Sequence, residues 1–138
     1  MVNQHPEQNR ETLVVIDYGS QYSQLITRRV RECQVYCEML PWDAPVEAID
    51  ALNPRGIILS GGPSSVYAPG APTLAPHLVE RGVPILGICY GMQLLGHYLG
   101  GTVAPSHSRE YGPSQVFVDD AASPLFRGMP DTLDAWMS

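Results

Sequence analysis

The chain has 138 residues, which is enough for one domain with a substantial core. Apolar residues make up 44% of it and charged residues 16%, a composition typical of globular proteins and not of disordered ones. The 14 acidic residues exceed the 8 lysines and arginines, so the net charge of −6 gives no electrostatic reason to expect a nucleic acid or an anionic membrane as a partner.

Cysteine content and apolar runs bound the compartment. Three cysteines without a regular spacing favour a reducing environment, so we expect a cytoplasmic protein. Cys33 and Cys37 are interpreted as structural residues and not as metal ligands. No apolar run approaches the roughly 18 residues of a membrane-spanning helix, and we expect no signal peptide. The basic run at 28–31 is interpreted as a solvated helix face.

The first hundred residues alternate between two patterns. Four short apolar runs predict β-strands at 12–17, 35–40, 56–60 and 84–88. Between and after them, apolar residues three and four apart predict helices at about 22–33, within 42–52, at 74–80 and at 92–99. Residues 1–11 are expected to form a flexible polar tail. This alternation predicts an α/β domain of three layers, with a mostly parallel sheet flanked by helices.

The first of these helices has a well-defined predicted face. Ser20 is expected to occupy its N-cap position, after a turn at 18–20. The apolar positions expected to pack against the sheet are Tyr22, Leu25, Ile26, Val30 and Cys33. Gly100 and Gly101 are expected to end the last helix of the series.

Beyond Thr102 the pattern changes to strands without helices between them. Strands are predicted at Val103, at 114–118 and at 132–137, with a turn at 123–126. The sequence stops at Ser138 inside the last of these strands. We therefore expect residues 12–138 to form a partial domain whose sheet is incomplete at its C-terminus.

The segment Gly87-Ile88-Cys89-Tyr90-Gly91 joins the fourth predicted strand to a helix. A nucleophile flanked at two residues on each side by glycine is the pattern of a nucleophile elbow, here with cysteine. Such a sharp turn presents Cys89 at the first turn of the helix, where backbone N–H groups and the helix dipole favour a thiolate. The alternative, that Cys89 is a small buried apolar residue, stays open.

A thiolate that attacks a carbonyl needs donors for the oxyanion. The backbone N–H of Tyr90 follows the nucleophile directly and can supply one. Gly61 and Gly62 end the strand expected beside the elbow, and glycine lets backbone approach a ligand closely, so this pair is predicted to supply the second.

Two other interpretations of the loop at 60–65 are rejected. It is not a Walker phosphate loop, because no Gly-Lys-Ser/Thr follows. It is not the Ser-Gly-Gly-x-Asp-Ser loop of ATP pyrophosphatases, because Pro63-Ser64 stands in place of x-Asp. A plain turn after a strand remains as the alternative.

No histidine is placed by the sequence as a general base for Cys89. His97 lies eight residues further along the same predicted helix, about 12 Å away along its axis. His5 lies in the tail, His77 on another predicted helix and His107 in a loop. The sequence thus predicts a nucleophile and part of an oxyanion hole without a base.

Taken together, these stretches resemble the class I glutamine amidotransferases from about Thr12 to the end of the chain. Within that family, the turn at 17–22 and the Cys-Tyr-Gly-Met-Gln elbow are most similar to the branch that aminates XMP to GMP. The anthranilate, carbamoyl-phosphate and CTP branches usually have a Cys-Leu-Gly elbow. The stretches that carry the resemblance are 16–22, 28–32, 58–63, 87–93, 109–112 and 136–138.

The resemblance implies a role for each site residue. Cys89 would attack the side-chain amide of glutamine, and the backbone N–H groups of Tyr90 and Gly62 would bind the oxyanion. Gly61 and Gln93 would help to hold the glutamine, and no metal is implied. Ammonia would leave, and water would hydrolyse the γ-glutamyl thioester.

The resemblance also implies partners beyond glutamine. Ammonia would pass to an ATP-pyrophosphatase type synthetase domain of the same parent chain, which uses ATP and magnesium to adenylate XMP. No cofactor is implied for the present 138 residues, and the parent protein is expected to be a homodimer.

The family's base and its orienting acid come from a His-Pro-Glu motif late in the domain, beyond the position of Ser138. We therefore expect these 138 residues to be an N-terminal part without useful glutaminase turnover. Two alternatives stay open: another cysteine-elbow hydrolase or a DJ-1-like protein, and an inactive truncated domain that serves as a binding module.

Overall fold

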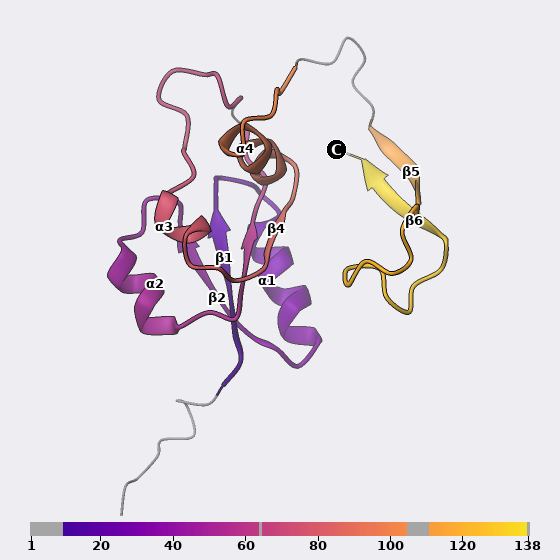
Figure 1. Cartoon of the computed structure of the whole chain (residues 1–138), viewed down its shortest axis with the longest axis horizontal. Helices are drawn as coiled ribbons and strands as arrows, with labels where there is room; N and C mark the ends of the chain where they lie inside the picture. The colour runs from indigo at the N-terminus through magenta and orange to yellow at the C-terminus, as the bar shows by residue number, and fades with distance from the viewer. Residues whose placement is uncertain (1–9, 64, 105–110, 138) are drawn as a thin grey trace, which may run out of the picture. The chain divides into compact units, whose positions relative to one another are not determined.

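The computed structural model describes residues 10–63, 65–104 and 111–137 (Figure 1). The chain divides into two compact units, residues 1–103 and 104–138. Of the predicted tail, only Arg10 and Glu11 belong to the described residues, so the prediction of a flexible tail lies outside them. The same holds for His5 and His107.

The first unit is built on a four-stranded sheet in the order β2-β1-β3-β4, in which every neighbouring pair is parallel. The prediction of a parallel sheet is therefore confirmed. In the register of the sheet, Val15 of β1 pairs with Met39 on one side and Ile58 on the other. The four strands are β1 (Thr12–Asp17), β2 (Tyr36–Pro41), β3 (Gly56–Leu59) and β4 (Ile85–Gly87).

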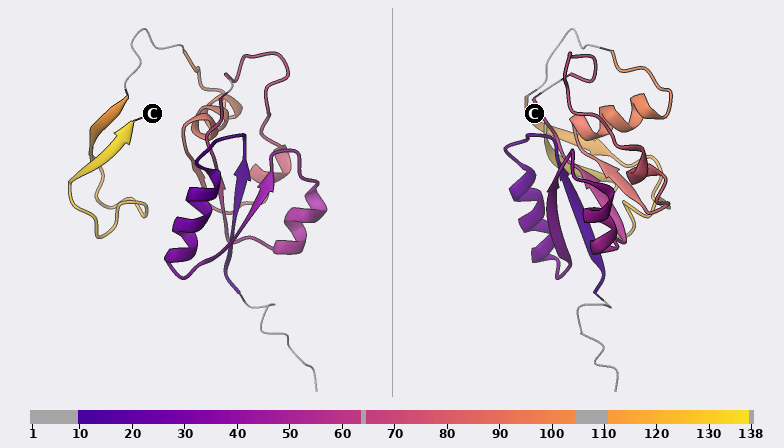
Figure 2. Two further views of the ribbon diagram at one scale, coloured as in Figure 1. Left: turned by 180° about the vertical axis from the view of Figure 1, so that it is seen from behind. Right: turned by 90° about the vertical axis from the view of Figure 1, so that its left-hand side faces the viewer.

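Helices cover both faces of this sheet, because side chains of a strand alternate between its faces. One core cluster joins Val14 and Leu59 of the sheet to Ile49, Leu78 and Leu94 of three helices. Figure 2 shows the first two helices on opposite sides of the sheet, which confirms the three layers. The helices are α1 (Ser23–Glu32), α2 (Val46–Leu52), α3 (Pro76–Val79) and α4 (Tyr90–Tyr98).

The opposite face is packed against α1 alone. There Val15, Cys37 and Ile58 form a second cluster, against which Ile26 and Val30 of α1 pack. The two clusters contain alternate residues of the same strands. A short apolar run thus supplies two cores at once, as expected for a strand covered on both faces.

The predicted buried face of α1 was only half right. Ile26 and Val30 pack against the sheet, but Tyr22, Leu25 and Cys33 are exposed. The fully buried positions are polar and are Ser23 and Thr27. The spacing of three and four holds, but the helix is rotated relative to the prediction.

The cause of this rotation is a polar tether at the start of α1. The Ser23 hydroxyl donates to Asp17 Oδ1 at 2.8 Å, and the Thr27 hydroxyl donates to the Ser23 carbonyl at 2.9 Å. Both hydroxyls are thereby satisfied and can be buried. Ser20 does not cap the helix as predicted: Tyr22 holds the N-cap position, and the Ser20 hydroxyl accepts the Tyr22 N–H at 3.0 Å, ahead of the helix.

Smaller differences concern the limits of elements. The third helix is one turn long and not seven residues, since Pro76 starts it and Glu80 already lies outside. At the end of α4, Gly100 adopts a positive φ of 86° and its N–H donates to the His97 carbonyl, so the predicted glycine stop is confirmed. Val103 belongs to no strand, which contradicts the prediction.

The second unit is a two-stranded antiparallel ribbon formed by β5 (Gly112–Phe117) and β6 (Thr132–Met137). The Val118 N–H donates to the Asp131 carbonyl at 2.8 Å and continues the pairing by one step. Residues 123–126 turn the chain as predicted, with the Phe126 N–H bound to the Ser123 carbonyl. Across the described ranges, no helix has the length and apolar character needed to cross a membrane.

The first prediction concerns the central core. Leu59 is 0% exposed, whereas Leu99 is 70% exposed. We expect Leu59→Ala to lower the free energy of unfolding by about 2–5 kcal/mol, because a cavity opens between the sheet and α4. Leu99→Ala, the matched control, should change it by less than about 0.5 kcal/mol. Urea denaturation followed by circular dichroism measures both, and a loss below about 1 kcal/mol for Leu59→Ala would contradict this packing.

Candidate active site

Cys89 lies on a sharp turn between β4 and α4, in the N-cap position of the helix. Its φ of 53° and ψ of −114° place a residue with a side chain in a region that favours glycine. Such a conformation costs on the order of 1–3 kcal/mol and persists only where its surroundings enforce it. The Cys89 side chain is exposed, so the interpretation of Cys89 as a buried apolar residue was wrong.

Two glycines make this turn sterically feasible. A Cβ atom on Gly87 would lie 2.7 Å from the Met92 Cα. One on Gly91 would lie 2.4 Å from the Leu59 carbonyl oxygen and 2.6 Å from the Leu59 Cβ. The first glycine thus lets the strand fold back onto the helix, and the second lets the helix rest directly on β3. The glycine spacing around Cys89 follows from these two contacts.

Backbone hydrogen bonds fix the turn in place. The Ile88 N–H donates to the Leu59 carbonyl at 2.9 Å, and the Gly91 N–H donates to the Ser60 carbonyl at 3.0 Å. On the helix side, the Gln93 N–H donates to the Cys89 carbonyl at 3.1 Å. The elbow is therefore tied to the end of β3 as well as to its own helix.

The loop after β3 borders the nucleophile, as predicted. Because β3 pairs with β4, the Gly61–Gly62 segment and Cys89 leave neighbouring strands at the same edge of the sheet. A Cβ atom on Gly61 would lie 3.3 Å from the Cys89 Cβ. Within the described residues, neither Gly62 nor Tyr90 donates its N–H to a backbone carbonyl. Their roles as oxyanion donors stay predictions.

A third loop reaches the site, and no local sequence pattern placed it there. The position of a Gly61 Cβ is 3.6 Å from the Ser20 hydroxyl oxygen, so the loop between β1 and α1 lies beside the elbow loops. In the sheet order, the chain leaves β1 on one side for β2 and returns on the other side as β3. Ligands of open α/β sheets bind at such a switch point, but its position follows from strand order and not from local sequence.

Two stacked tyrosines support these loops from below. The rings of Tyr18 and Tyr90 meet edge to face with centroids 5.7 Å apart, and the Tyr90 hydroxyl donates to the Pro72 carbonyl at 2.6 Å. Burial raises the pKa of Tyr18 strongly and that of Tyr90 to a smaller degree, and for Tyr18 the charge of Tyr90 adds to it. Both phenols are therefore neutral near pH 7 and act as packing groups.

The described histidines do not meet Cys89. His97 packs its ring against Tyr67, with centroids 5.5 Å apart, further along α4. His77 lies on α3, and its Nδ1 is buried without a hydrogen-bond partner. Within the described part of the chain, the Cys89 thiol has no hydrogen bond to either of them. The expectation that neither serves as its base agrees with this arrangement.

The other two cysteines differ in environment. Cys37 is fully buried in the sheet, and desolvation raises the pKa of its thiol. Cys33 is exposed after the end of α1. All three thiols are free of disulfides, as the interpretation of Cys33 and Cys37 requires.

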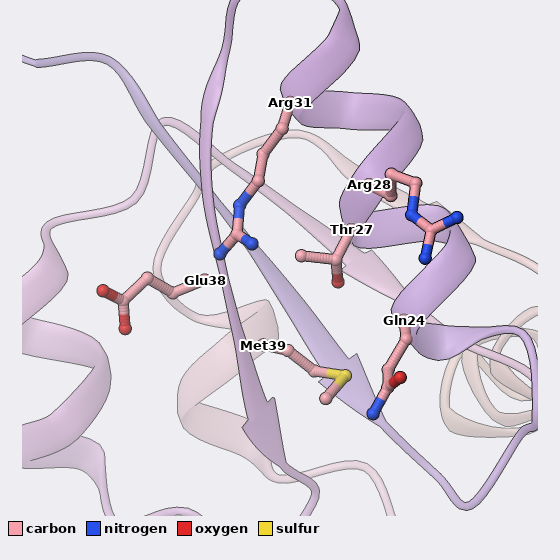
Figure 3. A pocket seen from close by; sticks show the side chains of 6 residues that line it. All are labelled: Gln24, Thr27, Arg28, Arg31, Glu38 and Met39. Carbon is pink, nitrogen blue, oxygen red and sulfur yellow. The ribbon is translucent and has the colours of Figure 1, made fainter.

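A cavity of about 530 Å³ lies elsewhere, between α1 and β2 (Figure 3). Arg31 reaches across it from α1, and its Nε and Nη2 both donate to the Cys37 carbonyl, at 3.2 and 2.8 Å. Because β2 is an outer strand, β1 and β3 separate this cavity from β4. It takes no part in the chemistry of the elbow, which lies at the open carboxyl edge of the sheet.

Comparison with known proteins identifies the family. The model of the family "Glutamine amidotransferase class-I" matches residues 14–138, and the chain belongs to this family. The chain is 56% identical over 137 residues to the glutamine-hydrolyzing GMP synthase of Thermomicrobium roseum, covering 99% of this chain and 26% of that protein. It is 55% identical over 126 residues to that of Carboxydothermus hydrogenoformans, covering 91% of this chain and 25% of that protein.

A solved structure supports the same fold. The crystal structure of a GMP synthase subunit from Thermoplasma acidophilum is similar with a TM-score of 0.70 and 26% identity. The match covers 92% of this chain and 63% of that one. The chain spans about a quarter of the length of the curated relatives named above.

The second prediction tests the contact between α4 and β3. Gly91→Ala should destabilise the fold by about 1–3 kcal/mol, because its Cβ would overlap the Leu59 backbone. Gly96, in the same helix, has nothing within 4 Å of its Cβ position. Gly96→Ala should therefore stabilise the fold by about 0.5–1 kcal/mol. Urea denaturation compares the two, and changes of the same sign and size would contradict the close approach at Gly91.

Proposed function

We propose that the chain is the glutamine-hydrolysing part of a GMP synthase. The observation that carries the proposal is an exposed thiol on a strained elbow, with the Gly61–Gly62 loop beside it, in a class-I glutamine amidotransferase. Strain of this kind at a reactive side chain is typical of functional sites. The names of the relatives point to the substrate and to the final product.

The geometry supports a covalent route. The Cys89 sulfur attacks the side-chain carbonyl carbon of glutamine, and the carbonyl oxygen becomes an oxyanion that the N–H groups of Gly62 and Tyr90 bind. The C–N bond then breaks, ammonia leaves and a γ-glutamyl thioester remains on Cys89. Water cleaves the thioester to glutamate and restores the thiol. Gly61 and Gln93 are proposed to hold the glutamine.

The fate of the ammonia is part of the proposal. We assign it to a synthetase domain that uses ATP and magnesium to activate XMP and convert it to GMP. No residue of the present chain is assigned to ATP or magnesium. In this role the chain works in the cytoplasm as part of a homodimer, with glutamine as its own substrate.

The family match decides between the interpretations left open by the sequence. A cysteine elbow also occurs in other hydrolases and in DJ-1-like proteins, but residues 14–138 match the class-I amidotransferase family. No specific observation favours those classes or a pure binding module, so we propose no second function.

The third prediction tests the nucleophile. A diazoketone analogue of glutamine should alkylate Cys89 in the intact chain, because it places an electrophile where the substrate amide would lie. Mass mapping of peptides locates the adduct. Cys89→Ser should abolish labelling, and Cys33→Ser, the matched control at another exposed thiol, should leave it unchanged. Labelling of Cys33 in preference to Cys89 would contradict the proposed site.

The fourth prediction concerns turnover by these 138 residues alone. The described histidines, His77 and His97, do not contact Cys89, so we propose that the chain lacks a base for the acyl transfer. Glutamate formation from glutamine should then not exceed that of Cys89→Ser. A His-Pro-Glu triplet does occur at 5–7, before β1 and outside the described residues. Turnover that His5→Ala abolishes would contradict the prediction and place the base there.

A further inference from the structure

Ser60 directly follows β3 and joins three parts of the site. It is 0% exposed. Its N–H donates to the Ile16 carbonyl and its carbonyl accepts the Gly91 N–H, both at 3.0 Å. Its hydroxyl accepts the Tyr18 N–H at 3.0 Å and donates to the Gly61 carbonyl at 3.0 Å. The end of β1, the elbow helix and the Gly61–Gly62 loop therefore all meet at this one residue.

The bond from Ser60 to Gly61 controls the direction of another group. The Gly61 carbonyl and the Gly62 N–H belong to one planar peptide unit, and the described residues contain no cis peptide bond. In a trans unit the two groups point in opposite directions. Because the buried Ser60 hydroxyl holds the Gly61 carbonyl, the Gly62 N–H points away from Ser60.

The backbone of Gly62 is fixed from a second side. A Cβ atom on Gly62 would lie 2.4 Å from the Tyr18 carbonyl oxygen, so its backbone rests directly on that of Tyr18. The Tyr18 N–H is bound to the same Ser60 hydroxyl. One buried hydroxyl thus sets both the orientation of the peptide unit and the position of the support beneath it.

We propose that the Ser60 hydroxyl is a positioning group that aims the Gly62 N–H at the oxyanion formed on Cys89. The inference rests on the proposed function, since it takes Gly62 to be an oxyanion donor. Ser60 itself contacts neither the substrate nor the thiol. Its effect is preorganisation: the donor is oriented before the charge develops, so no free energy is spent on turning it during the reaction.

Two reactions of Cys89 separate this role from a purely structural one. In acylation by the γ-(4-nitrophenyl) ester of glutamate, the sulfur attacks the carbonyl carbon, an oxyanion forms, and 4-nitrophenolate is expelled to leave a thioester. In alkylation by iodoacetamide, the sulfur displaces iodide from a saturated carbon and no oxyanion forms. Only the first reaction depends on the Gly62 N–H. The first rate is followed by release of 4-nitrophenolate and the second by mass mapping, both on the whole chain.

In Ser60→Ala, we expect the acylation rate to fall at least tenfold, and up to the roughly 10²–10³-fold known for loss of one oxyanion donor. The alkylation rate should stay within about twofold. Ser60→Thr keeps the hydroxyl and should recover most of the acylation rate. Ser65→Ala removes an exposed hydroxyl of the same loop and should change neither rate. Circular dichroism verifies that each variant is folded.

A second variant covers the case in which Ser60→Ala does not fold. Ser60→Cys preserves the shape of the side chain but forms weaker hydrogen bonds, and peptide mapping assigns each adduct to its residue. The same selective loss of acylation is expected for it.

An equal fall in both rates, or no change in acylation, would overturn the inference and leave Ser60 as a structural residue. A folded wild-type chain that iodoacetamide alkylates at Cys89 but that the glutamyl ester does not acylate would overturn the proposed function itself. The two failures are therefore distinguishable.

Discussion

The site depends on the close approach of α4 to β3, where the absence of a side chain at Gly91 lets the helix rest on the Leu59 backbone. Two hydrogen bonds from the elbow to the end of β3 reinforce this contact. Because these interactions hold both sides of the turn, Cys89 can keep a positive φ that an unconstrained residue would leave. The exposed thiol is a consequence of packing around it more than of its own preference.

The same principle explains why the residues of the site come from backbone loops and not from a set of long side chains. Parallel strands end at one edge, so the loops after β1, β3 and β4 meet there. Ser20, Gly61 and Cys89 are brought together although they are far apart in the sequence. A site built this way offers backbone N–H groups, which are the donors that stabilise an oxyanion most rigidly.

Much of this arrangement could be predicted from the sequence, because the informative patterns are local. Short apolar runs predicted the strands of the sheet, and the glycines around Cys89 predicted the elbow. The rotation of α1 could not be predicted, since it depends on the Asp17–Ser23 hydrogen bond, which buries a polar face. The place of Ser20 beside the nucleophile could not be predicted either, because it follows from strand order, which is a long-range property.

The strained backbone at Cys89 has a consequence for how the chain distributes its stability. A glycine at this position would occupy the same φ without penalty, so the fold and the chemistry favour different residues there. The elbow is in this sense a site of local frustration, where part of the folding free energy is used to hold one residue in an unfavourable conformation. Any loosening of the core beneath it would be relieved first at the turn, so reactivity would be lost before the sheet itself unfolds.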